Sequence, residues 1–307
     1  MPGTQRRGQY PPSPHGPSFP LIFPGASALD RVESMPEGHV IHRLAGELTQ
    51  RFGNSGLGPA LDITSPQGRF AREAAIVDQS RLLRADAHGK HLFIDFDVDH
   101  PEHIIYIHLG LIGTLQFEPA GETRGQIRLH ISDGAVAANL RGPQWCRLIT
   151  DEERDIAIGK LGADPIRDDA DPEPIRRRVQ RSGRSIGSLL MDQKLFAGVG
   201  NIYRAETLFR LGISPFTPGR EITDAQFTSI WTDLVGLMKE GVTAGRIDTV
   251  RHEHTPEVMG RAPRKDDHGG EVYTYRRTGQ PCYLCGTPIR DQVMEGRNLF
   301  WCPECQR

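Results

Sequence analysis

Four of the five cysteines form two CxxC pairs near the C-terminus, Cys282 with Cys285 and Cys302 with Cys305, and sixteen residues separate the pairs. Two such pairs can surround one zinc ion tetrahedrally, because a tight turn holds each pair. Four sulfur ligands leave no open coordination position, so the pattern predicts one structural zinc that fixes the intervening residues as a β-hairpin. The fifth cysteine, Cys146, is expected to be a free thiol in the core.

A second motif that could do chemistry is AGVGNIYRAE, residues 197–206. Gly198 and Gly200 allow close approach of the backbone, and the amides at the start of the following helix could bind a phosphate, with Asn201 as a further donor. On this motif alone, a helix–helix turn that needs glycine for packing is the preferred interpretation. Five arginines between residues 174 and 184 shift the balance towards a nucleic-acid site.

The segment SMPEGH, residues 34–39, places Met-Pro-Glu-Gly inside a chain that already begins with Met-Pro. Within a chain, the nitrogen of Pro36 is an amide without basicity. At the start of a chain it would be a secondary amine with a pKa near ~8, and it could act as a nucleophile. Chemistry at Pro36 therefore requires a mature chain that begins there.

Isolated basic residues carry less information. Lys90 begins a β-like run in GKHLF, and Arg141 and Lys160 follow in the same half of the chain. Each of these residues alone is most often a solvated surface charge. His39 and His42 are three residues apart on an expected helix, but no third metal ligand accompanies them. A surface position is the preferred interpretation for both histidines.

The bulk composition is that of a soluble globular protein with little charge bias. Charged residues make up 25% of the 307 residues, and the formal net charge is −2. No apolar run approaches the ~18 residues that a membrane helix needs. The cysteines form a metal pattern rather than a disulfide framework, which indicates the cytoplasm.

The elements that must position these residues can be predicted from periodicity. Residues 1–34 are rich in proline and are expected to be a disordered extension or a misassigned start. Apolar residues at every fourth position from Val40 to Phe52 predict an amphipathic helix that ends at Gly53. Short β-like runs then indicate a sandwich or a barrel, at residues 91–98, 103–109, 125–131 and 135–140.

After about residue 160 the pattern becomes helical. Two helices are predicted at residues 185–198 and 201–212, and a third follows Thr223, whose side chain could form a capping box with Gln226. The apolar stripe of the third helix is expected to be Phe227, Ile230, Leu234 and Leu237. Residues 244–271 are polar and rich in glycine, and we expect a long loop there.

Six motifs in a fixed order connect these elements: MPEG, GKHLF, HLGLIGTL, LLMDQKLFAGVGNIYRAE, YRRTGQPCYLCG and EGRNLFWCPECQ. Over nearly the whole chain after residue 35, the sequence resembles the formamidopyrimidine-DNA glycosylase/endonuclease VIII family of base-excision repair enzymes. MPEGH and Leu111 resemble the endonuclease VIII-like branch. The resemblance implies an α+β multidomain fold with a leading helix on a two-layered antiparallel β-sandwich (35–160), a helix-two-turn-helix domain (161–265) and a zinc-finger β-hairpin (266–307).

The resemblance also implies catalytic roles. Pro36 matches the N-terminal proline nucleophile of the family, and Glu37 matches its acidic partner, a general acid at the sugar ring oxygen. Lys90 matches a lysine that holds a phosphate beside the lesion. Arg297 matches the zinc-finger arginine that grips phosphates around the flipped nucleotide and assists elimination.

Further residues match positions that contact DNA in the family. Leu111 corresponds to the apolar wedge that fills the gap left by a flipped base, with Ile112 as its neighbour. Asn201 corresponds to a phosphate-binding asparagine, and Lys160 to a basic residue that contacts DNA.

Two segments depart from the family pattern. Gly110 replaces a glutamine that some endonuclease VIII enzymes use for the orphaned base. LRGPQWC stands where the formamidopyrimidine branch has an arginine–phenylalanine pair; Arg141 could substitute for the arginine, but Trp145 has no clear equivalent. These departures affect the preferred lesion and opposite base rather than the reaction class.

Taken together, the sequence predicts a bifunctional DNA glycosylase and abasic-site lyase with one structural zinc. Its partner would be double-stranded DNA with damaged bases or abasic sites, and the protein would be a monomer without membrane contact, located on DNA in the cytoplasm. The alternative is a zinc-containing protein that binds damaged DNA without cutting it, since a retained N-terminal extension would abolish the nucleophile.

Overall fold

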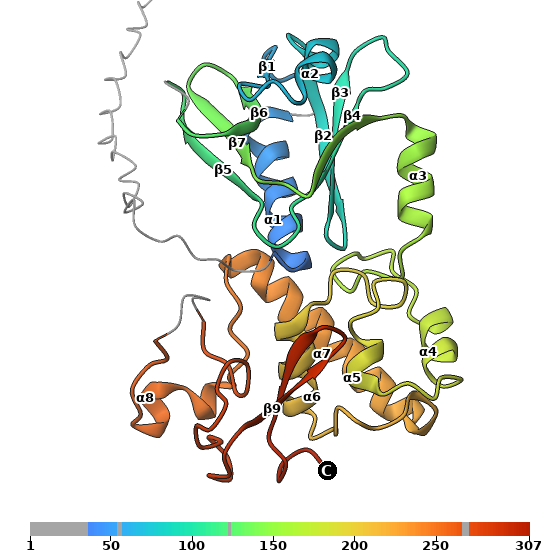
Figure 1. Ribbon diagram of the computed structural model, residues 1–307, viewed down its shortest axis with the longest axis vertical. Helices are drawn as coiled ribbons and strands as arrows, with labels where there is room; N and C mark the ends of the chain where they lie inside the picture. The colour runs from blue at the N-terminus through green and yellow to red at the C-terminus, as the bar shows by residue number, and fades with distance from the viewer. Residues whose placement is uncertain (1–35, 54–56, 122–123, 266–269) are drawn as a thin grey trace, which may run out of the picture. The chain divides into compact units, whose positions relative to one another are not determined.

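The computed structural model describes residues 36–53, 57–121, 124–265 and 270–307 (Figure 1). The extension expected at residues 1–34 lies outside these ranges. Within them, the helix predicted after Pro36 is present.

This first helix is α1 (Gly38–Leu48), and a single π turn (Thr49–Gly53) continues it. Leu44, Leu48 and Phe52 are buried on one side, as their four-residue spacing predicted. Burial of this apolar stripe therefore orients α1 on the sandwich. The N-terminus of α1 faces the rest of the molecule.

Two four-stranded antiparallel sheets form the layers of the predicted sandwich. Their strand orders are β1-β6-β7-β5 and β2-β3-β4-β8. The strands are β1 (Asp62–Thr64), β2 (Arg81–His88), β3 (His91–Asp97), β4 (Ile104–His108), β5 (Thr114–Pro119), β6 (Ile127–Ser132), β7 (Val136–Arg141) and β8 (Trp145–Ile149). One hydrophobic core joins both sheets and α1. Two helices accompany the sandwich, α2 (Ala71–Val77) and α3 (Asp151–Gly159).

The second half of the fold is mainly helical, with a hydrophobic core of its own. Its helices are α4 (Glu173–Val179), α5 (Ile186–Leu189), α6 (Asn201–Arg210), α7 (Asp224–Ala244) and the short α8 (Pro256–Met259). The α8 turn lies within the stretch expected to be a loop, of which residues 266–269 lie outside the described ranges. No helix in the described part of the chain has the length and apolar character needed to cross a membrane.

One predicted helix is wrong over most of its length. The stretch 185–198 is helical only in α5, and turns follow it. The Asp192 side chain accepts a hydrogen bond from the Lys194 amide, and the Gln193 side chain donates to the carbonyl of Val199. Such bonds between side chains and backbone offer the chain an alternative to the helix, and here they form the turns that lead into α6.

The helix predicted after Thr223 is confirmed as α7. Thr223 and Gln226 form the expected capping box, in which each side chain accepts a hydrogen bond from the other residue's amide. The predicted apolar stripe is buried: Phe227, Ile230, Leu234 and Leu237.

The C-terminal hairpin consists of β9 (Arg290–Met294) and β10 (Arg297–Trp301). It packs against the helical core through buried residues that include Phe300 and Cys302. The chain that leads to the hairpin is tied to α6 by Glu206, which is fully buried. The Glu206 carboxylate accepts hydrogen bonds of 2.6–3.0 Å from the amides of residues 273–275 and from the hydroxyls of Thr249 and Thr274. The predicted fold class, a sandwich followed by a helical domain and a zinc-finger hairpin, is confirmed.

Three glycines allow the sandwich and the helical half to touch through their backbones. The amide of Gly38, at the start of α1, donates to the carbonyl of Gly198 at 2.9 Å. Gly89, in the turn between β2 and β3, has a positive φ of 60°, and a Cβ there would lie 2.8 Å from the nitrogen of Gly198. Only a residue without a side chain fits at this contact.

The glycine contact predicts the effect of a matched pair of substitutions. Gly89→Ala should lower the free energy of unfolding by about 1–3 kcal/mol more than Gly134→Ala, because overpacking against the backbone adds to the cost of a positive φ. Gly134 also has a positive φ, of 88°, but no atom lies within 4 Å of its Cβ position. Urea denaturation of both variants measures the difference, and equal losses would contradict the contact.

Candidate active site and metal centre

A cavity of about 150 Å³ lies where the start of α1, the β2–β3 turn, the start of α6 and the C-terminal hairpin meet. The four predicted catalytic residues, Pro36, Glu37, Lys90 and Arg297, all line it. Its other lining residues are His108, Gly110, Leu111, Gln144, Met191, Gly200 and Asn201. Segments that are up to about 260 residues apart in the sequence therefore contribute to one small space.

Glu37 is the most constrained of these residues, with 1% of its surface exposed. It stands at the N-cap position of α1 but does not cap that helix. Its carboxylate instead accepts hydrogen bonds from the amides of Gly200 at 3.0 Å and Ile202 at 2.8 Å, at the N-terminus of α6. A helix N-terminus favours a negative charge. Burial nevertheless raises the pKa of Glu37, while Lys90 and the amides act in the opposite direction.

Lys90 follows Gly89 in the turn between β2 and β3 and lines the cavity. Its Nζ donates to the carbonyl of Val199 at 3.1 Å. Burial lowers the pKa of Lys90, Glu37 opposes this effect, and Arg297 adds to it. Lys90 does not have the solvated surface position that is usual for an isolated lysine. The contact between Gly89 and Gly198 brings the β2–β3 turn, and Lys90 with it, against the residues that precede α6.

Asn201 connects α6 to the hairpin that carries Arg297. Its side chain is buried and donates to the carbonyl of Asn298 at 2.9 Å. The Oδ1 atom of Asn201 accepts a hydrogen bond from Arg204, and the same guanidinium donates to the carbonyl of Met294. The position of Arg297 in the cavity is thus fixed by bonds to the backbone on either side of it.

The predicted wedge residues lie in the turn between β4 and β5. Leu111 is 57% exposed and Ile112 is 77% exposed, so two adjacent large apolar side chains lie in solvent at this turn. Gly110 precedes them with a positive φ of 72°, and the amide of Gly113 donates to the carbonyl of Leu109. The turn presents Leu111 at the rim of the cavity.

Two predicted DNA-contacting residues lie elsewhere. Arg141, at the end of β7, forms an ion pair of 2.9 Å with Glu118 on β5. Lys160 is exposed at the C-terminal end of α3. Neither residue lines the cavity with Pro36 and Glu37.

Three residues of the cavity were not singled out from the sequence: His108, Gln144 and Met191. His108 accepts a hydrogen bond at Nδ1 from the amide of Gly110, so this nitrogen carries no proton in the structure. Burial and the nearby Lys90 lower the pKa of His108. The only signal in the sequence was the place of His108 immediately before the turn that carries Leu111.

The surface positions expected for His39 and His42 are wrong. His39 is buried against Tyr203, with the ring centroids 5.5 Å apart, and burial lowers its pKa to about 4. His42 bonds through Nε2 to the buried carboxylate of Asp164 at 2.6 Å. Both lie on the side of α1 that α7 and the linker before α4 cover. Cys146 is a free thiol packed against the sandwich core, and burial raises its pKa to about 12.

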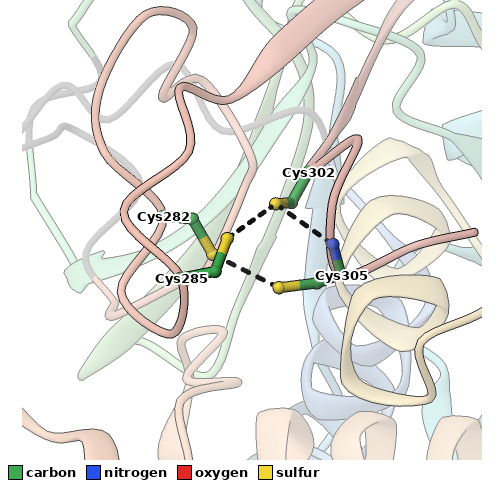
Figure 2. Close-up of side chains that lie close together, drawn as sticks. All are labelled: Cys282, Cys285, Cys302 and Cys305. Carbon is green, nitrogen blue, oxygen red and sulfur yellow. Dashed lines mark hydrogen bonds between the residues drawn. The ribbon is translucent and has the colours of Figure 1, made fainter.

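The four C-terminal cysteines converge at the base of the hairpin (Figure 2). Their sulfur atoms all lie within 4.8 Å of one another, with Cys285 and Cys302 at 3.4 Å and Cys282 and Cys305 at 3.9 Å. Zinc–sulfur bonds of about 2.3 Å in a tetrahedron place sulfurs about 3.8 Å apart, so the cluster fits one Zn²⁺. The predicted structural zinc is confirmed, and it holds the hairpin that positions Arg297.

Two protein-family models match the second half of the chain. Residues 161–252 match the formamidopyrimidine-DNA glycosylase H2TH domain, and residues 279–307 match the zinc finger found in FPG and IleRS. These matches cover α6, whose N-terminus lines the cavity, and the hairpin with its four flanking cysteines.

Comparison with whole proteins extends the similarity to the first half. The chain is 44% identical over 281 residues to endonuclease 8 1 of Mycobacterium tuberculosis (strain ATCC 25618 / H37Rv), covering 89% of this chain and all of that one. It is 33% identical over 210 residues to the formamidopyrimidine-DNA glycosylase of Parasynechococcus marenigrum, covering 65% and 73%.

Solved structures show the same architecture. MutM (Fpg) from Thermus thermophilus superposes with a TM-score of 0.67 at 26% identity, over 88% of this chain and 98% of that one. Lactococcus lactis Fpg, solved non-covalently bound to DNA with an AP site, superposes with a TM-score of 0.70 over 88% and 99%. At 20% identity, the second match supports the fold alone.

The raised pKa of Glu37 predicts a pH effect on stability. The folded chain holds the proton of this carboxyl to a higher pH than the unfolded chain, whose carboxyl titrates near 4.5. Wild type should therefore lose stability relative to Glu37→Gln as the pH rises above 4.5. The Gln side chain has one acceptor oxygen where the carboxyl has two, so one of the two backbone N–H groups faces an NH₂ group, but this cost does not depend on pH. Urea denaturation across the pH range measures the slope, and a flat or rising difference would show that the pKa is not raised.

Zinc content gives a second test of the site. Cys302→Ser should reduce bound zinc from one per chain to a small fraction and lower the melting temperature, because metal binding contributes to folding of the hairpin. Cys146→Ser is the matched control, since its thiol lies outside the cluster, and it should keep one zinc per chain. Elemental analysis measures both, and full zinc retention in Cys302→Ser would contradict the assignment.

Proposed function

The chain belongs to the formamidopyrimidine-DNA glycosylase/endonuclease VIII family of DNA repair glycosylases, and we propose that it removes oxidised bases from DNA and then cleaves the abasic strand. The observation that carries this proposal is the convergence of Pro36, Glu37, Lys90 and Arg297 on one cavity. A protein that only binds DNA has no need to combine an amine nucleophile, a buried carboxyl and two cations in so small a space.

In the proposed reaction, the nitrogen of Pro36 is a free secondary amine and attacks C1′ of the damaged nucleotide. The bond from C1′ to the base breaks and the base leaves. The nitrogen then loses its proton, and the C1′–O4′ bond of the sugar ring breaks as O4′ takes up a proton, which leaves an iminium between Pro36 and the opened sugar. Abstraction of a C2′ proton then expels the 3′ phosphate and breaks the strand. Water hydrolyses the iminium and releases the amine.

Glu37 is the proposed proton carrier in these steps. A general acid must hold a proton at the working pH, and burial raises the pKa of this carboxyl in the required direction. Its hydrogen bonds to two amides at the N-terminus of α6 fix its position beside Pro36. Glu37 would protonate the sugar ring oxygen as C1′ is attacked.

The cations bind the charged parts of the substrate. Lys90 would hold a phosphate next to the lesion, and Arg297 would hold the phosphates that flank the flipped nucleotide. Asn201 joins this group through its place at the α6 N-terminus. Zn²⁺ takes no part in the chemistry: it holds the hairpin on which Arg297 stands.

A damaged base within a duplex must rotate out of the stack, at a cost of a few kcal/mol. The exposed side chains of Leu111 and Ile112 supply an apolar wedge for the gap. Residues 35–160 would provide the reacting groups, residues 161–265 the helical DNA-binding surface and residues 266–307 the zinc hairpin. We expect the protein to act as a monomer on DNA in the cytoplasm.

Trapping by borohydride tests the nucleophile. With abasic DNA, a chain that begins at Pro36 should form a covalent adduct, because borohydride reduces the iminium to a stable amine. Pro36→Gly, in a chain started at Met35, should lose most of the adduct. Lys239→Gln is the matched control: it removes an exposed amine outside the cavity and should trap like wild type.

Mass spectrometry of the natural protein separates the two candidate functions. A mass that corresponds to a start at Pro36 supports the enzyme. A start at Met1 or Pro2, together with no adduct, would support a protein that binds damaged DNA without cutting it.

A further inference from the structure

The outer face of the β2-β3-β4-β8 sheet carries an unusual set of side chains. In the β4–β8 pair, Tyr106 lies opposite Arg147 and His108 lies opposite Trp145. Because alternate residues of a strand point to the same side, these four side chains share one face, and His91 on β3 joins them. The opposite face of the same strands is mainly aliphatic and packs in the sandwich core. The sheet therefore presents aromatic rings outward.

These rings contact one another in a continuous group. His108 stacks on Trp145 with centroids 4.5 Å apart, and His91 lies 5.0 Å from His108 and 5.7 Å from Tyr106. Burial lowers the pKa of His91 to about 3 and also lowers that of His108, so both imidazoles are neutral rings. His108 also lines the catalytic cavity, so the group begins there and extends along the sheet.

A second cavity, of about 520 Å³, lies over this face and under α3, which runs beside the sheet (Figure 1). Its floor is formed by Trp145, Tyr106 and His91, and its opposite wall by Ile156 and Ala157 of α3. Ile156 remains 50% exposed, although it is an isoleucine on the helix face next to the sheet. A slot between aromatic rings and aliphatic side chains suits a planar ligand, and its volume falls in the range of small-molecule sites.

The cavity also carries positive charge. Arg147 and Lys160 line it, and neither forms an ion pair with a carboxylate within the described ranges. The Arg147 guanidinium lies 5.7 Å from the ring centroid of Trp145. The one acidic lining residue, Glu153, accepts a hydrogen bond from the Thr150 amide in the cap of α3. A ligand with a planar ring and an attached anion could therefore place its ring in the slot and its anion against Arg147 and Lys160.

We propose that this cavity is a second nucleotide subsite, in which an unpaired base of the bound strand stacks between Trp145 and α3 while its phosphate lies against Arg147 and Lys160. Aromatic side chains on an open sheet face bind unstacked bases in this way, and every base offers a face for stacking. His108 lines the catalytic cavity and stacks on Trp145, which lines the second cavity, so the two cavities are neighbours and a nucleotide of the same strand is the occupant we infer. The inference rests on the proposed function, because binding of the damaged nucleotide in the catalytic cavity determines where that strand lies.

Binding of tailed DNA tests the subsite. The probes are duplexes with an uncleavable tetrahydrofuran abasic analogue next to a single-stranded 5′ tail, a single-stranded 3′ tail or a blunt end. Trp145→Leu removes the stacking ring, and Ile156→Trp fills the slot at a position exposed enough to tolerate it. Both variants should bind one of the two tailed probes about tenfold more weakly than wild type, as measured by fluorescence anisotropy.

Asp155→Trp is the matched control, because it places the same ring on the face of α3 that points away from the cavity. It should bind every probe like wild type, and all three variants should bind the blunt probe like wild type. If both cavity variants bind both tailed probes within about twofold of wild type, the subsite is overturned, since a stacked base is worth more than that. The subsite is also overturned if the two cavity variants lose the same amount of affinity for the tailed probes and for the blunt probe.

Free deoxyadenosine monophosphate distinguishes the two sources of a nucleotide. In one outcome, calorimetry detects binding of this compound by wild type but not by Ile156→Trp, while both proteins bind tailed DNA equally. That outcome would assign the cavity to a free nucleotide and overturn the strand assignment. The test is independent of catalysis. Failure of borohydride trapping with intact tail-dependent binding would refute the proposed reaction alone, and the reverse result would refute the subsite alone.

Discussion

The site depends on one buried carboxylate, that of Glu37, which accepts hydrogen bonds from two amides at the N-terminus of α6. This interaction joins the first described turn of the chain to a helix that begins more than 160 residues later. A buried carboxyl group needs hydrogen-bond donors, and the unpaired amides of a helix N-terminus need acceptors. Each group therefore supplies the partner that the other one needs. The cavity forms around that pair. Gly38, Gly89 and Gly198 make the approach possible by leaving the backbones free to touch.

Helix α6 is consequently the element from which the other parts take their positions. Its N-terminus holds Glu37, and Asn201 in its first turn holds the backbone beside Arg297. Glu206, about one turn later, binds the non-helical segment that leads to the zinc. Buried polar groups of this kind cost free energy unless every partner is in place. Directional hydrogen bonds from the ten residues of α6 thus fix the side of the cavity that holds Pro36 and Glu37 relative to the side that holds the hairpin. Zn²⁺ fixes the end of the hairpin farthest from Pro36.

Periodicity and spacing were sufficient for much of the fold. The α1 stripe, four strands, the α7 cap and the cysteine cluster follow from local rules, and motif order placed Pro36, Glu37, Lys90 and Arg297 in one family pattern. The rest depended on tertiary contacts. The stretch 185–198 has helical residues, but the side chains of Asp192 and Gln193 bond to the backbone and form turns. His39 has the spacing of a surface residue, yet α7 covers it. The aromatic face around Trp145 arises from cross-strand register, which single-strand patterns do not reveal.

The long separation between Glu37 and its helix has a consequence for biosynthesis. A ribosome that adds about 5–20 residues per second needs roughly 10–30 s to travel from one partner of this bond to the other. Throughout that interval the segment around Pro36 has no α6 to dock against, and the cavity cannot form. Once Gly200 and Ile202 emerge and α6 forms, the same segment is enclosed. Assembly of the cavity therefore comes late in synthesis, and chain topology alone sets that order.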